Sequence, residues 1–130
     1  LPALTVRPLA LTLLSFCLVK TENNMKLNPL VVCADGFSMS VQANGGAYCS
    51  PRVEGAQRYT TVEIGFPSEA EPLLMQYMES GYRDPDERED PTQSVYPFVP
   101  TSVVSLVIAK HGGIVEGKVP PGVAHLKAGT

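Results

Sequence analysis

The stretch DGFSMSVQANGGAYCSPR, residues 35–52, has the clearest pattern in this chain of 130 residues. Apolar and polar side chains alternate over 37–43, which is typical of a strand with one buried face and one face in water. Asn44–Gly45 is a strong hairpin signal, because both residues tolerate positive φ. The stretch therefore predicts a β-hairpin whose second strand, 47–49, returns antiparallel and ends before Pro51, which has no N–H to donate.

Segments on both sides of this stretch also have the character of strands. The apolar run at 30–33 predicts a short strand just before it. Residues 59–64 are rich in β-branched and aromatic side chains and predict a further strand. Residues 95–99 predict either an edge strand or a segment crossing the core, because proline interrupts them, and 114–116 adds a last short strand.

The clearest helix spans 101–111, where apolar residues recur at i, i+3 and i+4. Thr101 or Ser102 is expected to cap its start, and Gly112–Gly113 ends it. Together with the strands, this helix predicts an α+β fold. The expected architecture is an antiparallel sheet of four to six short strands with one main helix packed on it.

Two further segments are defined by polar residues. The sequence SEAE at 68–71 resembles a capping box and predicts a short helix, which 73–78 either continues or leaves as an extended segment. Residues 80–94 are acidic and interrupted by proline, which indicates an exposed loop. The loop lacks the spacing and central glycine of a calcium-binding EF-hand, so no calcium site is predicted there.

Size and charge limit the function classes. The chain has the length of one domain, and its 44% hydrophobic residues are enough for one packed core. Its net charge is −3, and its ten lysines and arginines are scattered. Broad electrostatic binding to nucleic acid is therefore not expected. A small anion needs only one or two local arginines and stays compatible with this composition.

The first 24 residues differ from the rest. We interpret 1–24 as a translated leader from an over-extended gene, because codons for 21–24 can contain a ribosome-binding site just before Met25. A signal peptide is an alternative, since an apolar run follows Arg7, and a genuine terminal strand or helix is another. Residues 25–130 then form the single α+β domain.

No catalytic or metal-binding motif is present in the sequence. The three cysteines form no C-x-x-C pair, so no zinc site is predicted. Cys33 and Cys49 are expected to be free thiols, with a cross-strand disulfide as the alternative. His111 is interpreted as a helix C-cap and Asp35 as a turn former. We therefore predict that the protein is not an enzyme and uses no cofactor.

A ligand-binding role is predicted near the end of the opening stretch. Arg52 follows a rigid proline, so its guanidinium is held in place to bind a phosphate with little loss of entropy. Aromatic residues close by can stack on a base or hydrogen-bond to it. The predicted ligand-binding residues are Arg52, Arg58, Tyr48, Tyr59 and Phe98. Two structural alternatives stay open, namely an ion pair of Arg52 with Glu54 or Glu63, and a core position for Phe98.

A resemblance adds to this interpretation. The pattern VVCADGFSMSVQA…YCSPR…VEIGFPSE…LLM.Y, followed by VYPFVPTSVVSLVIAKHGG, resembles small proteins encoded by bacteriophages and prophages of gut bacteria. The resemblance spans about 30–113. Among such proteins, the chain is similar to the anti-Thoeris sponge proteins. Those proteins sequester a cyclic nucleotide signal made by a host immune system and do no chemistry on it.

The resemblance implies a phage counter-defence protein in the cytoplasm of the infected bacterial host. Its ligand would be a cyclic ADP-ribose-like molecule or a cyclic dinucleotide. A homo-oligomer is expected to complete the pocket, because one small sheet does not enclose a nucleotide. No long nucleic acid and no membrane are expected as partners. The alternative is a phage accessory or inhibitor protein that binds another protein through the acidic loop and an exposed strand edge.

Overall fold

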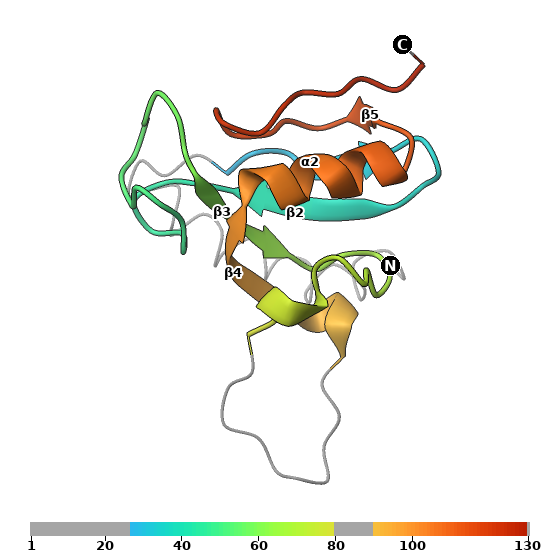
Figure 1. Cartoon of the computed structure of the whole chain (residues 1–130), viewed down its shortest axis with the longest axis horizontal. Helices are drawn as coiled ribbons and strands as arrows, with labels where there is room; N and C mark the ends of the chain where they lie inside the picture. Colours follow the sequence, from blue (N-terminus) through green and yellow to red (C-terminus); the bar gives the residue numbers. More distant parts are fainter. Residues whose placement is uncertain (1–26, 80–89, 130) are drawn as a thin grey trace, which may run out of the picture.

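A computed structural model describes residues 27–79 and 90–129 of the chain, which form one antiparallel sheet and one α-helix (Figure 1). The strands lie in the order β4-β3-β2-β1-β5. Their bounds are Val31–Cys33 for β1, Ser38–Gln42 for β2, Thr61–Gly65 for β3, Val95–Pro100 for β4 and Ile114–Glu116 for β5. Helix α2, Thr101–Lys110, lies across one face of the sheet. The predicted α+β fold is confirmed. The N-terminal segment 1–24 and the acidic residues of 80–89 lie outside the described residues.

The hairpin turn lies at Asp35–Gly36, where a turn was predicted, and not at Asn44–Gly45. Strand β2 pairs with β1 through the turn at Asp35–Gly36, where the Cys33 N–H donates to the Phe37 carbonyl at 2.8 Å. The other edge of β2 is taken by β3, so 47–49 has no free edge to pair with. The prediction of a second hairpin strand at 47–49 was therefore wrong.

Asn44 directs the chain away from β2 at this point. Its Oδ1 accepts the N–H groups of Gly46 at 2.7 Å and Ala47 at 2.8 Å. Such a turn, held by a side chain, satisfies the backbone locally and needs no strand partner. The next contact of the chain with the sheet is a single bridge between Ser50 and Thr61. Residues 44–48 thus form a loop beside the sheet.

The alternation predicted for 37–43 is confirmed by burial. One face of β2 and β3 packs with α2 and forms the core, which includes Met39, Val41, Val62, Ile64, Val104, Val107 and Ile108. These side chains are fully buried. The opposite face carries polar side chains, among them Ser40 on β2 and Glu63 on β3. The sheet therefore has one apolar face under the helix and one polar face.

Strand β4 is an edge strand, as one of the two predictions for 95–99 had it. Its outer edge is partly covered, because the Glu79 N–H donates to the Val95 carbonyl at 2.8 Å. Strand β5 is covered in a similar way by 126–128, which exchanges backbone hydrogen bonds with Ile114.

Helix α2 begins directly where β4 ends. Its N-cap is Pro100, with no side-chain hydrogen bond, so the predicted cap at Thr101 or Ser102 was wrong. The Thr101 N–H is satisfied instead by the Thr60 carbonyl at 3.1 Å. At the other end His111 is the C-cap, and Gly112 follows with a φ of 93°, as predicted. The described part of the chain has no helix long and apolar enough to cross a membrane.

The segment 68–71 is not a capping box, and no α-helix follows it. Ser68 Oγ accepts the Ser38 N–H at 2.9 Å, and the Glu71 carboxylate accepts the Leu73 N–H at 2.8 Å. Only a short 3-10 turn, η1 at Met75–Tyr77, forms after it. A second such turn, η2, spans Pro91–Gln93. The prediction failed because Glu71 is buried in contacts with the end of α2, and the Ser68 N–H donates to the Ser38 carbonyl instead of to Glu71.

Candidate functional site

Three of the five predicted ligand-binding residues come together on the surface, and we call Tyr48, Arg52 and Phe98 the aromatic cluster. The guanidinium carbon of Arg52 lies 4.8 Å from the centroid of the Tyr48 ring. The rings of Tyr48 and Phe98 are 5.9 Å apart, centroid to centroid, and tilted by 47°. Both rings stay accessible, since Tyr48 is 39% and Phe98 47% exposed. The arrangement offers a cation and two aromatic surfaces to a ligand.

A β-bulge positions Phe98. The register between β3 and β4 shifts between the pairs Val62–Val99 and Ile64–Tyr96, which leaves an extra residue on β4. Phe98 takes up this irregularity with a φ of 52°, in the left-handed region. A residue with a Cβ pays about 1–2 kcal/mol for that conformation. Bulges turn side chains away from the normal alternation, and here the phenyl ring is directed out of the core toward Tyr48.

Backbone contacts hold the other two members of the cluster. The Tyr48 N–H donates to Glu63 Oε1 on β3 at 3.0 Å, and the Tyr48 carbonyl accepts the Phe98 N–H. Arg52 donates to the Gly46 carbonyl at 3.4 Å, and it follows a cis Ser50–Pro51 peptide bond. Among the described residues Arg52 forms no ion pair with Glu54 or Glu63. Its guanidinium is therefore held against the Tyr48 ring, and its other donors have no partner within residues 27–79 and 90–129.

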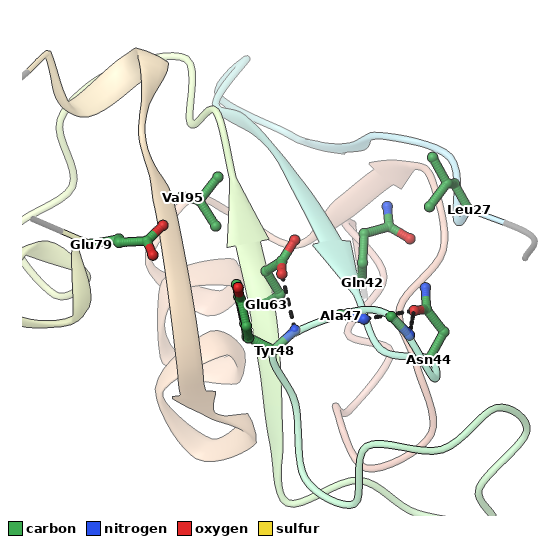
Figure 2. Close-up of a pocket in the computed structure, with 9 residues that line it drawn as sticks. Leu27, Gln42, Asn44, Ala47, Tyr48, Glu63, Glu79 and Val95 are labelled. Atoms are coloured by element: carbon green, nitrogen blue, oxygen red, sulfur yellow. Dashed lines mark hydrogen bonds between the residues drawn. The ribbon is translucent and has the colours of Figure 1, made fainter. Parts of the chain in front are cut away.

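A hollow of about 320 Å³ lies beside the aromatic cluster, on the polar face of the sheet (Figure 2). Gln42 and Glu63, which are cross-strand partners, line it from β2 and β3. Tyr48 and Asn44 line it from the loop 44–48, and Glu79 lies on the opposite side. Because Tyr48 belongs to both, the aromatic cluster forms one rim of the hollow.

Not all polar groups in the hollow are used within the protein. Gln42 is saturated, since its amide binds the backbone of Asn28 and the hydroxyl of Ser40. Asn44 is only 4% exposed, and its Oδ1 accepts two N–H groups, but its Nδ2 forms no hydrogen bond with any residue in 27–79 or 90–129. Glu63 uses one carboxylate oxygen for the Tyr48 N–H. The hollow thus keeps an amide donor and carboxylate acceptors for a ligand.

The remaining two predicted residues lie outside the aromatic cluster. Tyr59 is 2% exposed and belongs to the core. Its hydroxyl donates to the Val53 carbonyl at 2.7 Å and accepts the Ala56 N–H at 3.2 Å, so it anchors the connector between Ser50 and β3. Arg58 is exposed and does not line the hollow. Arg58 and Tyr59 are adjacent, and side chains at adjacent positions of a nearly extended chain point in different directions. Their closeness to Arg52 in sequence therefore did not place them in the same cluster.

A second cluster of ionisable groups lies at the C-terminal end of α2. His111 is 6% exposed, and its Nδ1 lies 2.6 Å from an Asp35 oxygen while its Nε2 lies 2.6 Å from a Glu71 oxygen. The other Glu71 oxygen accepts from Lys110 at 2.9 Å. Phe37 stacks on the imidazole with centroids 4.0 Å apart and planes 11° from parallel. We call Asp35, Glu71 and His111 the histidine clamp.

Electrostatics favour the fully charged form of the histidine clamp. Burial alone would lower the pKa of His111, but hydrogen bonds to Asp35 and Glu71 outweigh it and raise that pKa. Burial would raise the pKa of Glu71, but the Leu73 N–H, Lys110 and His111 together lower it. The pKa of Asp35 is lowered by the Phe37 N–H and then by His111. In its protonated form the imidazole donates through both nitrogens and has no lone pair to act as a base.

The histidine clamp was not visible in the sequence. The predictions that Asp35 forms a turn and that His111 caps a helix are confirmed, because Asp35 Oδ1 accepts the Phe37 N–H at 2.9 Å and His111 ends α2. The second carboxylate that contacts His111, that of Glu71, is 40 positions away in sequence. Nothing in the spacing of the three residues predicts their contact. The one signal in the sequence was that Glu71 stands between Ala70 and Pro72, next to apolar residues, which is a setting in which a carboxylate can be buried.

The cysteines that the structure describes are free thiols. Cys33 and Cys49 are both buried and unpaired with each other, as predicted. Burial raises the pKa of both thiols, so neither is an activated nucleophile. Within residues 27–79 and 90–129, no group of three or more histidine, cysteine, aspartate or glutamate side chains is arranged to hold a metal ion.

Comparison of the chain with family models, curated proteins and solved structures found no match. Function is therefore argued from the geometry of the aromatic cluster and the hollow beside it.

Proposed function

We propose that the protein binds a small nucleotide at the aromatic cluster and sequesters it without chemistry, as a phage counter-defence protein in the infected host cell. The observation that carries this proposal is the Arg52 guanidinium held over the exposed ring of Tyr48, with Phe98 beside it. A guanidinium binds phosphate oxygens through paired N–H donors, and exposed aromatic rings stack on bases.

The positions of these side chains favour binding over a purely structural role. Phe98 exposes 47% of its surface while holding a left-handed backbone conformation that costs free energy. Conformations of this kind persist where the surrounding structure enforces them and are frequent at binding sites. Contact with Tyr48 also fixes the Arg52 side chain before a ligand arrives, which reduces the entropy lost on binding.

Sequestration without chemistry is the simpler role for this set of groups. A hydrolytic site needs a nucleophile with a base in hydrogen-bond reach. Both nitrogens of His111 are engaged by carboxylates. Cys33 and Cys49 are buried thiols with raised pKa values. These features support a protein that holds its ligand unchanged.

The size of the hollow supports a role for a second copy of the chain. Its volume of about 320 Å³ is near the lower end of the range for small-molecule sites, roughly 300–1,000 Å³. A cyclic dinucleotide or a cyclic ADP-ribose would extend beyond it over the aromatic cluster. We propose that a homo-oligomer covers the exposed part of such a ligand.

Depletion followed by heat release tests this function. Purified protein is mixed with cyclic ADP-ribose isomers and with cyclic dinucleotides, filtered, and then heat-denatured. We expect one ligand to disappear from the filtrate and to return intact and in full after denaturation. Return of an altered molecule would mean that the protein is an enzyme, and no depletion of any ligand would contradict the proposal.

Binding of a protein partner through a strand edge has less support. The exposed edge that this alternative needs is partly occupied on β4, where the Glu79 N–H donates to the Val95 carbonyl. On β5 the segment 126–128 takes the same role. An edge covered in this way offers few free N–H and C=O groups to an added strand.

A further inference from the structure

We infer that the hollow selects nucleotides by charge, so that the ligand is a phosphodiester with one negative charge per phosphate and no terminal phosphate group. This inference rests on the proposed function and specifies the class of nucleotide that the site accepts. It comes from the contrast between the groups at the rim, where Arg52 lies, and the groups inside the hollow.

The interior of the hollow is acidic. Glu63 and Glu79 both line it, and Figure 2 shows them on the two sides of Val95. Arg52 contacts two lining residues, Tyr48 and Gly46, but stays outside at the rim. Two carboxylates inside and one guanidinium outside therefore set the local charge that a ligand meets.

This distribution orients the ligand. A phosphate is attracted to Arg52 and repelled by the carboxylates, so it stays at the rim. The interior instead suits a neutral group that carries proton donors, because Glu63 and Glu79 accept hydrogen bonds. Asn44 adds a donor there, since its Nδ2 forms no hydrogen bond with residues 27–79 or 90–129. A nucleobase edge or a sugar with hydroxyl groups presents both donors and acceptors, whereas a bare phosphate presents only acceptors.

The same distribution discriminates between nucleotides of different charge. Within residues 27–79 and 90–129, no cation other than Arg52 lies at this rim. A negative charge added to the ligand beyond the first is therefore repelled by Glu63 and Glu79 without a further cation from these residues to bind it. At separations of about 7 Å in water, this repulsion weakens binding by roughly threefold for each added charge. Salt reduces the effect, because the separation approaches the screening length.

Calorimetric titration with 3′,5′-cyclic AMP, 5′-AMP and ATP as probes tests this selection. We expect the cyclic monoanion to bind most tightly and ATP most weakly, with the difference shrinking as salt is raised. The double variant Glu63→Gln/Glu79→Gln keeps hydrogen-bond acceptors but removes both charges, so the affinity for ATP should rise relative to that for cyclic AMP by roughly thirtyfold at low salt. The double variant Glu69→Gln/Glu116→Gln, which removes the same charge from exposed positions outside the hollow, should keep the original order.

The possible outcomes separate this inference from the proposed function. Tightest binding of ATP, or an order of affinities that the glutamine substitutions at 63 and 79 do not change, overturns the charge selection and leaves nucleotide binding intact. If all three probes fail to bind while a cyclic dinucleotide is depleted, that cyclic dinucleotide is compared with its linear form, which carries a terminal phosphate. Tighter binding of the linear form overturns the charge selection alone. Failure of all probes together with no depletion overturns both.

Discussion

The Nε2 of His111 lies 2.6 Å from a carboxylate oxygen of Glu71, and this contact joins the C-terminal end of α2 to the loop after β3. Glu71 is 1% exposed, and its second oxygen accepts from Lys110 and from the Leu73 N–H. A buried carboxylate that lacks such partners would be costly. The contact therefore makes the position of the loop 66–74 depend on the charge of a single imidazole.

This dependence predicts a stability optimum in mildly acidic solution. The pKa values of Asp35 and Glu71 are lowered from 3.8 and 4.5, so their contribution is present above those values and is lost as pH falls through the lowered pKa. The pKa of His111 is raised from 6.5, so its contribution is present below 6.5 and is lost as pH rises through the raised pKa. We expect the clamp to stabilise most at about pH 5 to 6.

Thermal melts over a range of pH measure this prediction. His111→Gln should remove the loss of stability on the alkaline side, and His125→Gln is the matched control because His125 is exposed. A wild-type Tm that stays level from pH 6 to 9, or an identical profile for His111→Gln, would show that folding does not raise the pKa of His111.

Phe98→Gly should separate binding from stability. Glycine at a φ of 52° avoids strain of about 1 kcal/mol, but it also raises the entropy of the unfolded chain, so the net change in unfolding free energy should be near zero. Loss of the ring should weaken nucleotide binding by roughly tenfold, which is a typical cost for one stacked base.

The matched control for this substitution is Phe66→Gly. Phe66 has a φ of 50° and is 54% exposed, but it lies outside the aromatic cluster and does not line the hollow. Urea unfolding and calorimetry of both variants test the prediction. If Phe66→Gly reduced affinity as much as Phe98→Gly, or if Phe98→Gly bound normally, Phe98 would have no specific role.

The chain after β5 passes close to the start of β1 at Gly117. This residue has a φ of 103°, and a Cβ there would clash with the Leu30 carbonyl and with Val31. Gly117→Ala should therefore lower the unfolding free energy by about 3 kcal/mol or more, from strain and overpacking together. In Gly36→Ala, where φ is 94° but the space is open, strain alone should cost about 1–2 kcal/mol. Equal losses in urea unfolding would argue against the close approach.

The local patterns of the sequence predicted much of the fold. Alternation over 37–43 identified the buried face of β2, and the apolar stripe at 101–111 identified α2, because both signals depend only on neighbouring residues. The predicted pairing of β2 with 47–49 was wrong, because β3 pairs with that edge of β2 instead. Which of two segments pairs with an edge depends on residues far apart in sequence, so no local pattern indicates it. The supposed cap at 68–71 failed for the same reason, since Glu71 contacts His111.

The candidate site was predicted in part. Tyr48 and Arg52 were found because a short rigid segment keeps them together. Phe98 was identified as a ring between prolines, but its contact with Tyr48 depends on a bulge that no local pattern indicates. Asn44 and Glu63 were missed as site residues. Asn44 was interpreted only as a turn former, and Glu63 only as a strand residue facing solvent.

The most direct test of the account is the effect of Arg52→Ala on nucleotide affinity. Arg52 is exposed and stacked on Tyr48, so its removal should leave the Tm nearly unchanged. Loss of a charged hydrogen bond to phosphate should weaken binding of the depleted cyclic nucleotide by roughly tenfold or more. Arg58→Ala, which removes the same charge from an exposed position away from the hollow, should bind like the wild type. Unchanged calorimetric affinity in Arg52→Ala, or an equal loss in both variants, would contradict the claim that the aromatic cluster is the nucleotide site.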